Sequence, residues 1–438
     1  MKNVLLISAD FPSSYFQFAK AYKKNGCTVL VIGSTPYNEL HPELKANVDE
    51  YVQSWDMENV DKMCEIVGYL QNKWGTIEYL ESNNEYWLRN DSIIRERFGI
   101  SSGIYPHQLD EYQKKSSLKK FFLEAGFKVA PYMIVKDFDE LKKFAEKYGY
   151  PLFSKPDIGV GAAGNYKIEN YEQLEQYWRE KPQIDYIIEP FVKGQIISFD
   201  GIADKNSEVV VAINEIFPRE IFDYLKTGAD MFYFVNNKVP ENILPLGKKL
   251  IKAMGLQNRF FHTELFVAEN EVKDAFKPGD IVGLEVNIRT PGGFTPDLLN
   301  YSLSTNLYQM LADVICFGKT TQTVGPRCYA ACASRRRGTS YFYNEEDIRR
   351  TFAKELCNVG DYPDVFSGLM GNRFFMAKFD SLKDVEIFNA YVSKRTDASF
   401  KVPTAVSHIL GEDKRMLDDR KAEAKHEGAI CDRHIDGA

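Results

Sequence analysis

A short alternating stretch near residue 285 constrains the fold more than any other part of the sequence. Read with the two-residue period of a β-strand, one face of residues 283–289 carries Glu285, Asn287 and Arg289. The opposite face carries Leu284, Val286 and Ile288. The pattern predicts a strand with one polar face and one core face. Pro291-Gly292-Gly293 then ends the strand, and its glycines let the backbone approach a ligand closely.

A second strand-like segment, 260–267, precedes this stretch, and the turn-rich residues 269–280 separate the two. We expect a hairpin that places Glu264 opposite Glu285. Two facing carboxylates repel each other unless a cation lies between them. The hairpin therefore predicts a Mg²⁺ site in which Glu264, Glu285 and Asn287 supply the oxygen ligands. The alternative is that the charged residues only cover the exposed face of an antiparallel strand.

Length and composition limit the class of protein. A chain of 438 residues with 44% hydrophobic residues is large enough for two to four domains with real cores. A net charge of -7 argues against a general nucleic-acid surface. Seven scattered cysteines without a Cys-x-x-Cys motif favour free thiols and a cytoplasmic protein. No apolar run is long enough to span a membrane, and residues 3–8 are interpreted as a first strand rather than a signal peptide.

The N-terminal segment alternates strand, helix and strand over residues 3–33, which predicts a parallel sheet in an α/β domain reaching residue 105. The first turn lacks Gly-x-Gly-x-x-Gly, so we do not expect a dinucleotide site. Further elements are expected at these residues: helices at 15–24, 58–75, 84–98, 110–126, 138–148, 241–254, 296–317 and 345–355, and strands at 77–82, 129–135, 184–194, 195–200, 208–214, 328–334, 369–380 and 400–409.

A glycine-rich loop follows the strand that ends at Lys155. Gly159, Gly161 and Gly164 leave backbone N–H groups free to surround phosphate oxygens, with Lys155 as a point charge beside them. The alternative is a flexible surface hairpin. The loop is not a Walker A motif, because no Gly-Lys-Ser/Thr closes it. Downstream, Glu189 and the backbone of Phe191 and Val192 are expected to present a hydrogen-bonding edge to an adenine.

Two features of the C-terminal part can each be interpreted in two ways. Arg335-Arg336-Arg337 predicts either a solvated basic rim or a clamp for an anionic substrate. The charged tail from residue 412 contains Cys431 and His434, a weak hint of a metal site in a segment expected to be helical or frayed.

The ordered set of Lys115, Lys155 with its glycine loop, Glu189 to Gly194, Glu264, and Glu285-x-Asn287-x-Arg289-x-Pro-Gly-Gly resembles the ATP-grasp superfamily. Within it, the chain is similar to carboxylate–amine ligases such as L-amino-acid ligases and carnosine synthase, over residues 1–320. The resemblance implies an α/β (α+β) ATP-grasp fold with an N-terminal Rossmann-like pre-ATP-grasp domain and a C-terminal α+β subdomain. The implied boundaries are 1–105 for the pre-ATP-grasp domain, 106–187 and 188–322 for the two ATP-grasp lobes, 323–411 for the C-terminal subdomain and 412–438 for the tail.

The resemblance also implies roles for single residues. ATP would contact Lys115, Lys155, the loop glycines Gly159, Gly161 and Gly164, and the adenine-binding residues Glu189, Phe191 and Val192. The Mg²⁺ ligands, with Mn²⁺ as an alternative metal, would be Glu264, Glu285 and Asn287, and the catalytic residues would be Arg289, Gly292 and Gly293. One position departs from the family, because Ile196 stands where a ribose-binding glutamate is usual. Gln195 or Asp200 is the candidate replacement.

The activity implied is ATP-dependent amide or peptide bond formation between small molecules, amino acids above all, through an acyl phosphate, with release of ADP and phosphate. Three alternatives stay open: a carboxylase-type enzyme that uses bicarbonate, a kinase-type enzyme that stops at a phosphorylated product, and an ATP-binding protein without chemistry. The partners expected are a small carboxylate and a small amine, with neither nucleic acid nor membrane, and a homodimer stays open. Segments 210–240 and 326–410 are expected to determine which substrates bind.

Overall fold

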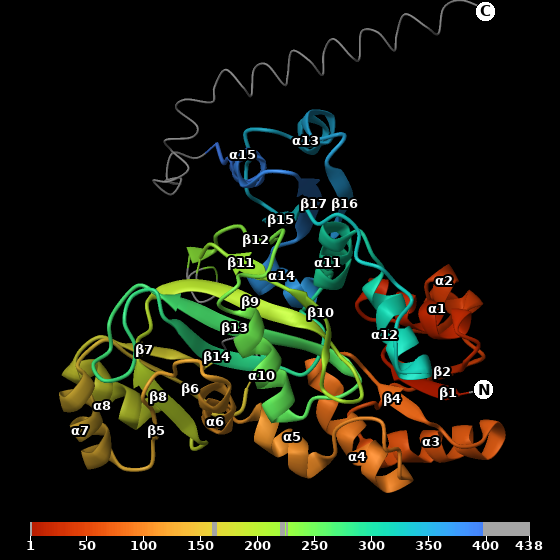
Figure 1. The fold of residues 1–438 in the computed structure, drawn as a ribbon, viewed down its shortest axis with the longest axis horizontal. Helices are drawn as coiled ribbons and strands as arrows, with labels where there is room; N and C mark the ends of the chain where they lie inside the picture. The colour runs from red at the N-terminus through yellow and green to blue at the C-terminus, as the bar shows by residue number, and fades with distance from the viewer. Residues whose placement is uncertain (1, 160–163, 220–223, 225–226, 397–438) are drawn as a thin grey trace, which may run out of the picture. The chain divides into compact units, whose positions relative to one another are not determined.

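The structure, a computed structural model, describes residues 2–159, 164–219, 224 and 227–396 (Figure 1). These residues divide into two compact units. The first unit comprises the described residues within 1–216, 238–300 and 305–325, and the second comprises the described residues within 217–237, 301–304 and from 326 onward. Within the described residues, no helix is long and apolar enough to cross a membrane.

The chain begins with a four-stranded sheet in which every pairing is parallel, in the order β3-β2-β1-β4 (red to orange in Figure 1). The strand–helix–strand start predicted over residues 3–33 is therefore confirmed, whereas β3 was not predicted. The elements are β1 (Asn3–Ile7), α1 (Phe16–Lys24), β2 (Thr28–Gly33), α2 (Pro42–Ala46), β3 (Glu50–Gln53), α3 (Val60–Trp74), β4 (Tyr79–Glu81) and α4 (Leu88–Phe98). Gly99 ends α4 in a left-handed conformation, as expected for a C-terminal glycine.

A buried ionic cluster joins this sheet to the central part of the first unit. Glu81 accepts hydrogen bonds from Arg95 at 2.9 Å and from Arg259 at 2.8 Å, and all three side chains are at most 2% exposed. Arg259 also donates to the carbonyl of Ile288 at 2.8 Å, next to the predicted catalytic arginine. Asp91 lies in the same cluster, 4.0 Å from Arg95, and accepts from the backbone N–H of Ser82.

Asp91 makes the stability of the protein depend on pH. Burial, opposed by Arg95 and reinforced by Glu81, raises the pKa of Asp91 to about 7. Because the folded pKa exceeds the unfolded value of about 4, the native state holds the extra proton and loses stability as pH rises through 7. We expect Asp91→Asn, which mimics the protonated form, to gain about 2–3 kcal/mol relative to wild type between pH 5 and pH 8 in urea unfolding. Equal pH profiles would contradict this assignment.

A second sheet, antiparallel in the order β5-β8-β6-β7, forms the gold part of Figure 1. Its core packs the apolar sides of α7 and α8 on the strands. The strand predicted to end at Lys155 is observed as β6, which pairs with β7 across the glycine loop, and α8 was not predicted. The elements are β5 (Met133–Ile134), α7 (Phe138–Tyr148), β6 (Leu152–Pro156), β7 (Tyr166–Ile168), α8 (Tyr171–Glu180) and β8 (Tyr186–Pro190).

The single helix predicted for residues 110–126 is wrong. The structure has two helices, α5 (Pro106–Gln113) and α6 (Lys115–Ala125), separated by Lys114 in an extended conformation. Asp157, just after β6, accepts hydrogen bonds from the backbone N–H and the hydroxyl of Ser116 at 2.8 Å. A carboxylate from a distant loop thus caps the start of α6, and no local pattern indicates that break.

The central sheet of the first unit presents one core face and one polar face. Its strands run in the order β14-β13-β9, and β10 pairs with residues 200–203 of β9. Helices α6 and α10 cover the core face through one apolar cluster. Close packing requires glycine at two points, because a Cβ at Gly283 would lie 2.3 Å from Phe122 and one at Gly247 would lie 2.4 Å from Phe199. The elements are β9 (Gly194–Ala203), β10 (Val209–Ile213), β11 (Glu215–Phe217), α10 (Leu244–Met254), β13 (Arg259–Ala268), β14 (Ile281–Asn287), α11 (Thr295–Leu303) and α12 (Leu307–Phe317).

The second unit contains antiparallel strands in the order β12-β15-β17-β16, and α15 packs on β15. Arg335 donates to the carbonyl of Val392, and Arg336 donates to carbonyls at 229 and 367–369. Two of the three arginines predicted to form either a solvated rim or a clamp therefore hold backbone in place. The strand predicted at 400–409, Cys431 and His434 lie outside the described residues. The elements are β12 (Phe232–Val235), β15 (Tyr329–Arg335), α13 (Glu345–Thr351), β16 (Leu356–Asp361), α14 (Ser367–Met370), β17 (Arg373–Phe379) and α15 (Leu382–Val392).

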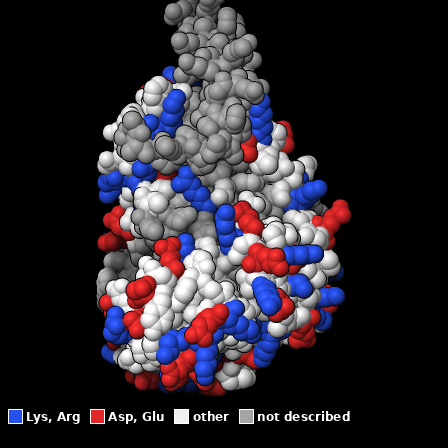
Figure 2. Space-filling view, turned by 90° about the vertical axis from the view of Figure 1, so that its left-hand side faces the viewer, with Lys and Arg blue, Asp and Glu red and all other residues white. Residues whose placement is uncertain are grey.

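Charged side chains of both signs are interspersed on the face shown in Figure 2. Exposed ion pairs occur on the described surface, for example Lys20 with Glu43 and Arg97 with Asp61. Such pairs contribute little to stability because water screens them. Buried charges, such as Glu81, Arg95 and Arg259 of the first unit, have greater structural consequences.

Candidate active site

Two rows of polar side chains cross the central sheet on the face opposite α6 and α10. The strand register aligns Ser198, Glu264 and Glu285 in one row. The next row contains Asp200, His262 and Asn287. The predicted pairing of Glu264 with Glu285 is therefore confirmed. The alternation predicted around it fails at one position, because the register shifts between Glu264 and Leu265, and Leu284 is the extra, half-buried residue at this bulge.

The facing carboxylates have different electrostatic environments. Burial raises the pKa of Glu285, Lys115 lowers it, and the neighbouring Glu264 raises it further. Burial would also raise the pKa of Glu264, but the hydrogen bond and the charge of His262 outweigh burial and lower it. Two carboxylates and the Asn287 amide are hard oxygen donors, so this donor set fits Mg²⁺.

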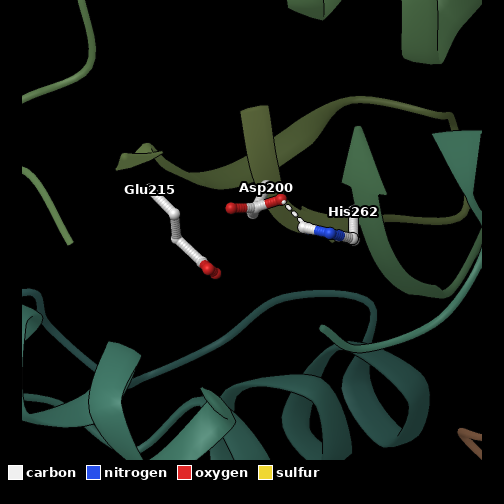
Figure 3. A group of neighbouring side chains, drawn as sticks. All are labelled: Asp200, Glu215 and His262. Carbon is white, nitrogen blue, oxygen red and sulfur yellow. Dashed lines mark hydrogen bonds and ion pairs between the residues drawn. The ribbon is translucent and has the colours of Figure 1, made fainter. Parts of the chain in front are cut away.

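His262 connects the predicted metal ligands to a fully buried cluster that the sequence did not predict (Figure 3). Its Nδ1 lies 2.7 Å from Asp200, and its Nε2 lies 3.3 Å from Glu264. Glu215, from β11, lies near both, and the ligating atoms of Asp200, Glu215 and His262 are all within 4.8 Å of one another. Burial and the charge of Asp200 raise the pKa of Glu215 well above its ordinary value. Burial beside Asp200 thus disfavours the charged form of Glu215, and the Asp200–His262 pair contacts Glu264 through the Nε2 atom of His262.

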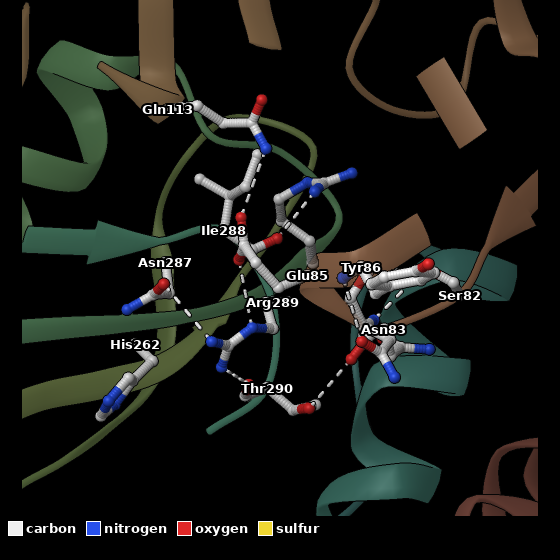
Figure 4. Close-up of polar contacts among 12 residues, drawn as sticks. Ser82, Asn83, Glu85, Tyr86, Gln113, His262, Asn287, Ile288, Arg289 and Thr290 are labelled. Atoms are coloured by element: carbon white, nitrogen blue, oxygen red, sulfur yellow. Dashed lines mark hydrogen bonds and ion pairs between the residues drawn. The ribbon is translucent and has the colours of Figure 1, made fainter. Parts of the chain in front are cut away.

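Arg289 lies in a bend just beyond β14, not on the strand as predicted, because the ladder with β13 ends at Asn287. Its guanidinium is fixed by three acceptors (Figure 4): Glu85 at 3.1 Å, the carbonyl of Thr290 at 2.6 Å and the Asn287 side chain at 3.4 Å. The Thr290 hydroxyl lies 2.7 Å from that of Tyr15. The N-terminal α/β part therefore positions this arginine, and Glu85 was not predicted from the sequence.

A buried trio of charges lies beside the loop that was predicted to bind phosphate. Glu189 contacts Lys119 closely and accepts from Lys155 at 3.0 Å, and all three are at most 5% exposed. Burial would raise the pKa of Glu189, but the two ammonium groups outweigh burial and lower the pKa to about 2. Burial in turn lowers the pKa of Lys119. Glu189 thus holds two lysines in position, and Lys119 is a further site residue for which no role was predicted.

The predicted adenine edge is partly used within the protein. The backbone N–H of Phe191 donates to the carbonyl of Pro151 at 2.9 Å, and the carbonyl of Phe191 accepts from Asn270 at 3.0 Å. Val192 packs with a small apolar cluster under β13. The backbone groups of Phe191 and Val192 were predicted to bind adenine, and those of Phe191 already have partners within the protein.

Lys115 links the glycine loop to the metal ligands. Its ammonium donates to the carbonyl of Gly159 at 2.9 Å and lies 3.9 Å from Glu285. A cavity of about 90 Å³ opens here, lined among others by Gly159, Glu285, Asn287 and Glu85. Glu85 and Asn287, which are 202 positions apart in the chain, thus line one cavity.

The remaining predicted residues have these positions. Gly164 has φ +76 at the end of the loop, and Gly161 lies outside the described residues. Gly293, at φ +62, and Gly292 form the turn into α11. Ile196 is 4% exposed and pairs with Phe266, so this position offers an apolar surface.

Comparison with known proteins identifies a known domain in part of the chain. Residues 113–256 match the family of the ATP-grasp domain. The chain thus contains an ATP-grasp domain over these residues, and it has the mixed α/β fold of the ATP-grasp structures that it resembles, as its sequence predicted.

Its relatives are similar along much of the chain. The L-arginine-specific L-amino acid ligase of Bacillus subtilis is 21% identical over 338 residues, covering 74% of this chain and 78% of that protein. The alanine–anticapsin ligase of B. subtilis strain 168 is 23% identical, covering 60% of this chain and 57% of that protein. The chain also matches the large chain of carbamoyl phosphate synthase from Neisseria meningitidis at 22% identity, spanning only 24% of that protein.

Solved structures share the fold. An L-amino acid ligase from Bacillus licheniformis superposes with a TM-score of 0.66 at 15% identity, covering 89% of this chain and 96% of that one. An ADP complex of N5-carboxyaminoimidazole ribonucleotide synthetase gives a TM-score of 0.63 at 14% identity, covering 88% and 95%. Likeness at this identity establishes the fold alone, so the reaction must be argued from the site.

Proposed function

We propose that this protein is an ATP-dependent carboxylate–amine ligase that joins two small molecules, amino acids above all, through an acyl phosphate. The observation that carries the proposal is the convergence of Glu264, Glu285 and Asn287 on two paired strands, at a point where Lys115 lies 3.9 Å from Glu285 and Arg289 donates to Asn287. The similarity to two amino acid ligases supports it.

The reaction has two balanced steps. A carboxylate oxygen of the acid attacks the γ-phosphorus of ATP, the bond from that phosphorus to the bridging oxygen breaks, and ADP leaves. The amine nitrogen then attacks the carbonyl carbon of the acyl phosphate and forms a tetrahedral oxyanion. Collapse of this oxyanion expels phosphate, and the nitrogen loses its proton to give the amide.

The residues of the chain have separate tasks in these steps. Lys115 and Lys155 neutralise phosphate oxygens, and Glu189 holds Lys155 in place for that contact. Glu264, Glu285 and Asn287 would hold Mg²⁺, which, when bound, neutralises charge on the phosphates. Arg289, fixed by Glu85, donates to the transferred phosphoryl group and to the oxyanion.

The proposed reaction predicts that turnover requires both substrates. We expect ADP release to be slow with ATP alone and to rise about tenfold or more when a carboxylate and an amine are added together, because water must be kept from the acyl phosphate until the amine arrives. The measurement is ADP and phosphate release in a paired screen of amino acids and small acids. Full turnover with bicarbonate alone would favour a carboxylase, a stable phosphorylated product would favour a kinase, and ATP binding without turnover would indicate a non-catalytic protein.

A further inference from the structure

Two cysteines far apart in the sequence lie side by side in the first unit, away from the candidate active site. The Sγ atoms of Cys27 and Cys316 are 3.3 Å apart. Cys27 lies immediately before β2 and is buried, whereas Cys316 lies in the last turn of α12 and is partly exposed. A disulfide has an S–S length of about 2.05 Å, so rotation of the side chains with a small approach would join the two.

Hydrogen bonds hold the two segments together on several sides. Lys2 donates to the carbonyl of Ile315 at 2.7 Å. The Asn25 side chain donates to Asp313 at 3.0 Å and accepts from Gln309 at 2.8 Å. These contacts connect the two segments that carry the cysteines. The backbone positions therefore keep the two thiols close to each other.

We propose that Cys27 and Cys316 form a peroxide-responsive dithiol, in which Cys316 reacts first and Cys27 completes a disulfide. This site is independent of the proposed ligase reaction. The partial exposure of Cys316 admits a small oxidant, and the burial of Cys27 keeps it as the resolving partner. The local chemistry assigns the same order, because the hydrogen bond from Cys27, opposed by burial, lowers the pKa of Cys316 to about 7. The hydrogen bond to Cys316, together with burial, raises the pKa of Cys27.

The oxidation balances with hydrogen peroxide as the oxidant. The Cys316 thiolate attacks one peroxide oxygen, the O–O bond breaks, and hydroxide leaves, which gives a sulfenic acid. The Cys27 sulfur then attacks the Cys316 sulfur, the S–O bond breaks, and the departing hydroxyl takes the Cys27 proton as water. Two electrons pass from the sulfur atoms to the peroxide, and two thiols with one peroxide give one disulfide and two waters.

The first test is peptide mapping of the full chain after mild peroxide treatment, without reduction. We expect trypsin to release residues 25–45 linked to residues 290–319, in a product that reductant separates. The linked pair should be absent from Cys27→Ala and Cys316→Ser and should persist in Cys64→Ser, a control on the remote helix α3. Conversion of wild-type Cys316 to sulfinic acid without the linked pair would overturn the proposal.

A second measurement does not depend on oxidation. Cys316 should react with iodoacetamide at pH 7 about tenfold faster in wild type than in Cys27→Ala, because removing the thiol donor returns Cys316 toward an ordinary thiol. Equal rates would show that the two thiols do not interact in solution and would also overturn the proposal. Native far-ultraviolet circular dichroism of each variant verifies its fold.

Discussion

Replacing Arg289 with lysine is expected to lower the rate constant for amide formation by about 10²–10³-fold while ATP affinity stays near that of wild type. Lysine retains the positive charge but loses the planar fork of donors. That fork is fully oriented here, since Glu85, the carbonyl of Thr290 and Asn287 each accept one of its N–H groups. The loss should fall on the chemical step, because charge on the oxyanion develops only in the transition state.

The measurement is single-turnover amide formation together with equilibrium binding of ATP. Arg97→Lys is a matched control, because Arg97 lies on the surface, where it pairs with Asp61 and contacts the Cys64 sulfur. It should leave both quantities unchanged. An undiminished chemical step in Arg289→Lys would remove Arg289 from the mechanism and leave it a structural residue at the end of β14.

The sequence predicted those parts of the fold that depend on local patterns. The strand–helix–strand start appears as parallel β1 and β2 around α1, and the helix predicted at 138–148 matches α7. The pairing of Glu264 with Glu285 also followed from local patterns, because two alternating stretches flank a turn-rich segment. Strand alternation and turn-forming residues involve only positions close together in the chain, so both patterns can be recognised in a single sequence.

What the sequence could not predict depends on contacts between distant segments. Glu85 and Arg289 are 204 positions apart, and neither segment carries a pattern that identifies the other as its partner. Lys119 is likewise buried against Glu189, which belongs to a distant strand, and no local pattern indicates that contact. The bulge at Leu284 and the end of β14 before Arg289 depend on the register with β13, which the hydrophobic pattern alone does not specify.

Removing the carboxylate of Glu285 should abolish turnover, with a loss greater than about 10²-fold, and should weaken Mg²⁺-dependent ATP binding. The fold should survive Glu285→Ala, because burial and Glu264 already disfavour the charged form of this side chain. Stability should therefore stay equal to that of wild type or rise. The measurements are binding of a non-hydrolysable ATP analogue with and without Mg²⁺, and thermal unfolding in the absence of metal.

The binding and unfolding measurements together distinguish a metal ligand from a side chain that only covers the exposed face of the strand. Glu96→Ala, at an exposed position of α4, is the control and should change neither metal dependence nor turnover. A metal ligand predicts that Glu285→Ala loses the Mg²⁺-dependent part of binding while metal-free stability holds, because the repulsion with Glu264 disappears together with the ligand. A decorative residue predicts unchanged binding. If Glu285→Ala kept wild-type turnover, the metal assignment of the row formed by Glu264 and Glu285 would be wrong, whatever the role of Arg289.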